Sequence, residues 1–147
     1  MFGGKKDTQE DRRKYVRLEK AFRIKYGVIG VGKKIPVQYD LLDSVELKYN
    51  GHTKDICEGG LCLENGDLKE LLRTSVKEGT ELRLRILISG KDFEDIDTIG
   101  KVAWVDLEKD ICGVKFIFIQ REDCHKIRNY IRDEYIGNYK KLTSRSN

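Results

Sequence analysis

The chain has 147 residues, of which 37% are charged and 39% are hydrophobic, and its formal net charge is +4. This length favours one domain with a real hydrophobic core. No apolar run approaches the roughly 20 residues that cross a bilayer, and residues 1–7 lack the apolar stretch of a secretion signal. We therefore expect an intracellular, cytoplasmic protein without a membrane span. The mild charge does not call for a nucleic-acid polymer, which needs a concentrated basic face.

The first half of the chain contains several period-2 patterns. Residues 1–17 are polar and charged, which is typical of a flexible arm. The alternation over 21–26 predicts a half-buried strand, and 37–39 are compatible with a short strand after Pro36. Residues 45–49 alternate again.

The next segment contains two glycine turns. Asn50-Gly51 is a hairpin cue because both residues tolerate positive φ, so 52–56 would form the return strand. A tight turn at Glu58-Gly59-Gly60 then leads into a strand over 61–64. The leucines of 65–72 fit a short helix that ends near Gly79.

The second half of the chain gives the clearest patterns. Residues 81–88 predict a strand, whose partners would be 97–106 and 111–119, joined by a turn around 108–110. Trp104 is expected in the core of that pair, because aromatic side chains commonly anchor packing; the alternative is that its indole faces a bound ligand for stacking. Apolar residues at helical spacing then predict a helix over 123–135.

These elements together indicate a mainly β fold, a small antiparallel barrel capped by a C-terminal helix. Closure of the barrel would remove exposed strand edges. We expect one domain over 18–136, preceded by the arm (1–17) and followed by a polar tail (137–147).

Chemistry of two kinds is not supported by the sequence. There is no nucleophile–base pair, carboxylate pair or Walker-type loop, so we predict that the protein is not an enzyme and needs no cofactor. No metal is predicted either, because the cysteines and histidines show no zinc-ligand spacing; they are Cys57, Cys62, Cys112, Cys124, His52 and His125.

The first candidate binding cluster lies where the arm meets the barrel. Arg12, Arg13 and Arg17 are concentrated in six residues, with Arg13 and Arg17 four residues apart. Guanidinium groups bind phosphate by forked hydrogen bonds, stack on flat rings and pair with the O6/N7 edge of guanine. Taken alone, the run is more typical of a solvated basic tail than of a binding site.

The second cluster is the turn from Asp55 to Gly60. Asp55 is an acceptor that suits the N–H donors of a guanine edge. The adjacent glycines, Gly59 and Gly60, allow a ligand to approach the main chain closely. Taken alone, this turn is as typical of an ordinary hairpin corner as of a binding site.

Taken in this order, the two clusters resemble the signature of the PilZ domain family, RxxxR followed by [D/N]xSxxG. They read Arg13-x-x-x-Arg17 and Asp55-x-Cys57-x-x-Gly60, and the likeness continues in 99–105 and 112–117. The resemblance implies a six-stranded antiparallel barrel with a helix. It also implies cyclic di-GMP as the ligand.

The resemblance further implies roles for single residues. Arg13 and Arg17 would hold phosphates and guanine faces, Asp55 would meet a guanine edge, and Gly60 would keep the turn open; Arg12 is an alternative in the arginine register. Cys57 stands where the family has serine. A thiol is a weak donor, so we expect a loss of about 0.5–1.5 kcal/mol, or tenfold in affinity at most.

The expected function is that of a cyclic di-GMP receptor. Binding would order the arm over the barrel and change the surface met by an effector protein. A ligand-independent adaptor in motility or pilus systems is the alternative, and a small-barrel binder of RNA or single-stranded DNA is a distant third. The sequence leaves open a monomer or a homodimer, and one bound ligand or a stacked pair.

Overall fold

The computed structural model describes residues 17–31, 44–88 and 95–145, with side chains described as far as Ile136. The arm up to residue 16, which includes Arg12 and Arg13, lies outside the described residues. So does the short strand expected over 37–39.

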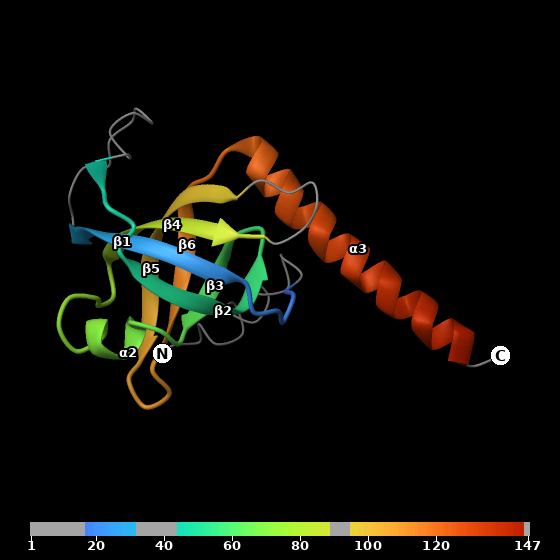
Figure 1. Ribbon diagram of the computed structural model, residues 1–147, viewed down its shortest axis with the longest axis horizontal. Coiled ribbons are helices and arrows are strands. Elements are labelled where there is room, and N and C mark those ends of the chain that lie inside the picture. The colour runs from blue at the N-terminus through green and yellow to red at the C-terminus, as the bar shows by residue number, and fades with distance from the viewer. Residues whose placement is uncertain (1–16, 32–43, 89–94, 146–147) are drawn as a thin grey trace, which may run out of the picture.

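Six antiparallel strands form a closed barrel (Figure 1). They are β1 (Arg23–Val31), β2 (Tyr49–Cys57), β3 (Gly60–Glu64), β4 (Thr80–Leu87), β5 (Ile96–Asp106) and β6 (Ile111–Phe118). The order around the barrel is β1-β2-β3-β6-β5-β4. The expected mainly β fold, a six-stranded antiparallel barrel with a C-terminal helix, is confirmed.

The barrel interior is filled by alternate residues of the strands, as the period of 2 requires. On β4, Leu82, Leu84 and Ile86 are fully buried between the charged residues of the same strand. A second layer of packing lies under the C-terminal helix, where Phe22 meets Tyr130 edge to face with ring centroids 5.2 Å apart. The barrel therefore provides a packed frame, on whose surface the functional groups lie.

The hairpin expected at Asn50-Gly51 is wrong. Both residues lie inside β2, which runs without a turn from Tyr49 to Cys57. Gly51 lies in a crowded place, since a Cβ there would lie 3.2 Å from the Glu64 carbonyl oxygen. The Asn-Gly pair with positive φ is Asn65-Gly66, at φ 64° and 63°, where the chain leaves β3.

Two other short elements differ from expectation. Residues 45–48 lie outside any strand, because β2 begins only at Tyr49. The helix expected from the leucines of 65–72 is a single turn, α2 (Leu68–Leu71). It ends well before Gly79, whose φ of 93° marks the entry into β4.

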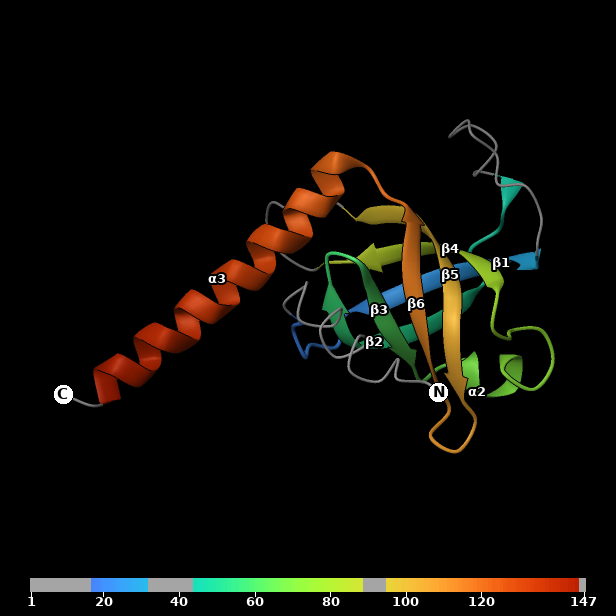
Figure 2. The same ribbon diagram turned by 180° about the vertical axis from the view of Figure 1, so that it is seen from behind.

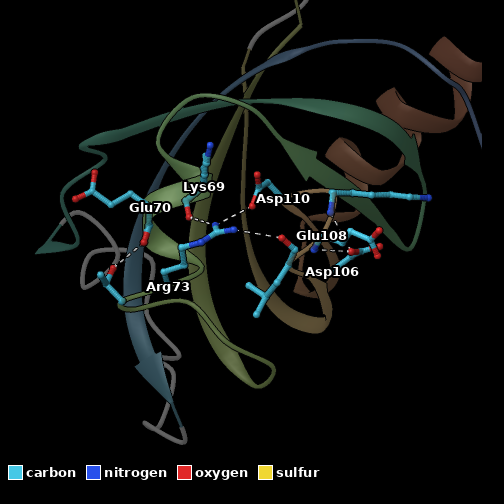
Figure 3. A network of polar contacts seen from close by, with 9 residues as sticks. Lys69, Glu70, Arg73, Asp106, Glu108 and Asp110 are labelled. Atoms are coloured by element: carbon cyan, nitrogen blue, oxygen red, sulfur yellow. Dashed lines mark hydrogen bonds and ion pairs between the residues drawn. The ribbon is translucent and has the colours of Figure 1, made fainter.

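A polar network joins the end of α2 to the β5–β6 turn (Figure 3). Arg73 forms an ion pair with Asp110 at 2.7 Å and donates to the Lys69 carbonyl oxygen at 2.7 Å. Asp106 accepts the backbone N–H groups of Glu108 and Lys109 at 3.0 Å each, which fixes the turn. This network ties the segment after α2 to the β5–β6 turn.

The C-terminal helix α3 (Arg121–Arg145) is longer than the expected 123–135 and continues into the segment 137–147 expected as a tail. Ile127 and Ile131 are buried one turn apart against the barrel. Beyond them the helix extends away from the barrel (Figures 1 and 2). None of the described helices is long and apolar enough to cross a membrane.

Candidate functional site

The structure brings Arg17 beside the second motif. Leu18 forms an isolated antiparallel bridge with Ile56, with N···O distances of 2.8 and 3.0 Å. This bridge places Arg17 next to Asp55, and its Nη1 donates to Asp55 Oδ1 at 3.2 Å. Two residues 38 positions apart in the sequence are thus joined at the mouth of one site.

The turn between β2 and β3 has the tight form expected from its glycines. Cys57 pairs with Gly60, which leaves Glu58 and Gly59 as the two turn residues. Neither glycine has a positive φ. Gly60 is needed for another reason: a Cβ would lie 2.1 Å from the Val114 carbonyl oxygen on β6. The absent side chain lets β3 and β6 approach closely under the turn.

A groove with a volume of about 440 Å³ opens beside this turn. Its lining comes from the arm base, the β2–β3 turn, the strands β3, β5 and β6, and the start of α3: Arg17, Cys57, Glu58, Gly59, Gly60, Leu61, Cys62, Ala103, Trp104, Gly113, Val114, Lys115, Phe116, Ile119 and Cys124. Figure 2 shows β3, β6 and β5 side by side on this face. The groove combines a guanidinium, an ammonium and an indole with exposed backbone, a set that suits an anion with flat rings.

Trp104 is the main departure from the sequence prediction. It was expected in the core, but 42% of it is exposed and its indole lies over Gly113. A register shift between Val102 and Trp104 is the cause. Simple alternation would put both side chains inside the barrel, whereas this β-bulge turns Trp104 outward.

The helix α3 grips both parts of the site. Arg128 binds Glu58 of the turn with two hydrogen bonds, of 2.8 and 3.0 Å. Tyr135 donates its hydroxyl hydrogen to the Arg17 carbonyl oxygen at 2.9 Å. The arm base and the glycine turn are therefore both tied to one helix.

The pKa shifts in the groove follow from these contacts. The hydrogen bonds of Arg128 lower the pKa of Glu58, which stays ionised. Burial raises the pKa of Cys62 to about 11 and also raises that of Cys124. Both thiols are protonated at neutral pH and are poor nucleophiles. No cluster of metal-binding side chains occurs within the described part of the chain.

Four of the predicted site residues lie in the groove lining: Arg17, Cys57, Gly59 and Gly60. Asp55 lies beside them through its contact with Arg17, and Arg12 and Arg13 lie outside the described residues. The groove also contains Lys115, which the sequence prediction missed, and Trp104, for which a place beside the ligand was the less favoured of two predictions. Alternation after Lys101, Val102 and Ala103 predicts a buried Trp104, so no local pattern in the sequence indicated its outward position.

The chain is similar to known proteins in both sequence and fold. Among solved structures it resembles the Bacillus subtilis inhibitor of motility (MotI/DgrA), with a TM-score of 0.59 and 18% identity. The likeness covers 86% of this chain and 52% of that protein, so the chain spans about half its length. At this identity the likeness shows the fold alone. A comparison with curated proteins finds no match.

A family model gives the decisive match. The model of the PilZ domain matches residues 11–133, most of the chain, including both motifs and the strands behind them. PilZ domains are receptor and adaptor domains for cyclic di-GMP rather than enzymes. The protein belongs to the PilZ domain family.

Proposed function

We propose that this protein is a cyclic di-GMP receptor whose ligand lies in the groove beside the β2–β3 turn. The observation that carries the proposal is the contact between Arg17 and Asp55 at the mouth of that groove. The contact joins the two halves of the binding signature, which are far apart in the sequence. The lining of the groove offers positive charge for the phosphates and the flat indole of Trp104 for the bases.

The chemistry of each group follows from its position. Arg17 is about half exposed, so its ion pair with Asp55 is weak and open to exchange. The Arg17 guanidinium would donate two parallel hydrogen bonds to the oxygens of a phosphate. That exchange would free the Asp55 carboxylate to accept from a guanine edge. Trp104 would stack on a base.

We further propose that the ligand orders the arm that precedes Arg17. Arg12 and Arg13 would fold over the ligand with it and close the site. The ordered arm would change the surface presented to an effector protein. Because the neighbour in fold is an inhibitor of motility, a motility system is one setting for such an adaptor.

The direct test is isothermal calorimetry with cyclic di-GMP on the full chain. We expect binding in the micromolar range or tighter, and a loss of at least about 1.5 kcal/mol in Arg17→Ala, as for a hydrogen bond to a charged group. Arg23→Ala is the matched control, because Arg23 is an exposed arginine of β1 outside the groove. Absence of heat at high micromolar ligand would reject the receptor and leave the ligand-independent adaptor.

Trp104 gives a second, optical test, because it is the only tryptophan of the chain. Stacking of a guanine on the indole should quench its fluorescence as ligand is added. The quenching should follow the same saturation curve as the calorimetric heat. Heat without any change in emission would exclude Trp104 from the site.

A further inference from the structure

A second groove lies on the outer face of β5 and β6, next to the proposed ligand groove. It has a volume of about 670 Å³ and is lined by Glu78, Gly79, Lys101, Val102, Ala103, Lys115 and Ile117. Ala103 and Lys115 line both grooves. The two surfaces are therefore continuous, and an occupant of one meets groups that also serve the other.

Two lysines dominate the charge of this second groove. Lys101 and Lys115 stand directly opposite each other on the paired strands, and both are exposed. Like charges in this position oppose each other. Neither forms an ion pair with a described residue; Glu81 faces Lys101 from β4, but its side chain is buried, and Glu78 lies at the rim. The pairing of the two lysines is therefore unfavourable, and carboxylates of an anionic partner would offset their repulsion.

The same face carries exposed apolar side chains. Ile117 is 39% exposed and Trp104 is 42% exposed, and both flank the lysines. Apolar side chains surrounded by charge are typical of a protein contact surface. The barrel is closed, so a partner cannot add a strand to the edges of the six described strands. Recognition here has to use side chains on the sheet face.

We propose that this face, named here the Lys101–Lys115 face, docks an acidic amphipathic helix of a partner protein. The partner's carboxylates would pair with Lys101 and Lys115, and its apolar stripe would cover Ile117 and Ala103. A concave groove of this kind holds a helix in a known mode of peptide recognition. Docking of the helix does not depend on the proposed receptor function. Only the effect of the ligand on docking rests on it.

The coupling follows from Lys115. A dianionic ligand in the first groove takes up part of its positive charge, which leaves less for the partner's carboxylates. Ligand should therefore weaken the docking of the acidic helix, and by linkage the helix should weaken ligand binding by the same factor. Release of a partner would then be the output of the ligand signal.

The test uses a 20-residue peptide with leucines along one helical face and glutamates beside them, titrated into the ¹⁵N-labelled full chain. We expect amide shifts at Lys101, Ala103, Lys115 and Ile117. A peptide with lysines in place of the glutamates should not bind. Absence of shifts at millimolar acidic peptide, or shifts elsewhere, would overturn the proposal.

Variants separate the docking face from the ligand groove. Lys101→Glu and Ile117→Asp should each weaken the peptide at least tenfold and affect cyclic di-GMP binding far less, since neither residue lines the ligand groove and only the shared Lys115 connects the two. Lys25→Glu is the matched control, an exposed lysine on β1 across the barrel. Unchanged peptide affinity in Lys101→Glu would reject the face. Arg17→Ala should lose ligand and keep the peptide, so failure of one function does not mimic failure of the other.

The same variants test two other possible occupants of the Lys101–Lys115 face. If Lys101→Glu halved the number of cyclic di-GMP molecules bound, the groove would be a second ligand site and the proposal would fail. If phosphatidylserine vesicles bound in a Lys101-dependent way while the peptide did not, the face would be a membrane contact. Equal peptide affinity with and without saturating ligand would overturn the coupling through Lys115.

Discussion

Cys57 is the last residue of β2 and is 8% exposed, with its side chain against the ligand groove. The family signature has serine at this position. A hydroxyl donates a much stronger hydrogen bond than a thiol, and the two side chains are close enough in size to occupy the same place. We therefore expect the residue at position 57 to adjust the affinity for the ligand and to leave the fold unchanged.

Cys57→Ser should bind cyclic di-GMP more tightly, by about 0.5–1.5 kcal/mol, which is up to roughly tenfold. Calorimetry on the purified variant measures the change. Cys57→Ala is the control: it removes a weak donor only and should stay within about threefold of the natural protein. Equal affinities of the serine and alanine variants would show that position 57 makes no hydrogen bond to the ligand.

At the scale of elements, α3 acts as a clamp on the site. It binds the glycine turn through Arg128 and Glu58, and the arm base through Tyr135 and the Arg17 carbonyl group. Lys20, just after the arm, also donates to the Tyr130 hydroxyl at 2.6 Å. A movement of the arm or the turn would therefore displace this helix as well.

Arg128→Met should lower the free energy of unfolding in a pH-dependent way. Because Arg128 lowers the pKa of Glu58, the pair stabilises the fold at pH values above the ordinary glutamate pKa of 4.5. This contribution is lost as the pH falls through the lowered pKa and Glu58 takes up a proton. The difference between the natural protein and the variant should therefore be present at pH 7 and vanish at strongly acid pH.

Urea denaturation across that pH range measures the difference. Arg132→Met is the matched control, since Arg132 is an exposed arginine of the same helix whose one ion pair with a described residue is to its neighbour Asp133, at 3.9 Å. The control should show no such pH dependence. A gap between Arg128→Met and the natural protein that persists at acid pH would mean that Arg128 acts through something other than Glu58.

At the scale of the whole molecule, the closed barrel fixes the relative positions of the two motifs. The groove takes residues from β2, β3, β5, β6 and α3, so its shape depends on the complete fold. A ligand that binds only this assembled groove stabilises the folded state against the unfolded chain.

Saturation with cyclic di-GMP should accordingly raise the melting temperature. At a ligand concentration 100 times the Kd the stabilisation is about 2.7 kcal/mol, which corresponds to about 5–10 °C for a chain of this size. Differential scanning fluorimetry measures the shift. Arg17→Ala at the same ligand concentration should shift much less. An unchanged melting temperature of the natural protein would count against the groove as the site.

The sequence by itself determined the class of fold and most of the strands. The period-2 patterns over 81–88, 97–106 and 111–119 match β4, β5 and β6 to within one residue at every end. Both motifs could also be recognised from the sequence, because each is a local run of residues. Local patterns of this kind carry their meaning within a few neighbouring positions.

The tertiary structure alone decided how distant residues meet. Asn50-Gly51 looked like a turn, yet neighbouring strands hold it inside β2; Trp104 looked like core, yet a bulge in its pairing with β6 turns it outward. Register and close approach depend on the partner strand, which is specified elsewhere in the chain. For the same reason only the assembled barrel placed Lys115 and Trp104 beside Arg17, and no run of sequence contains all three.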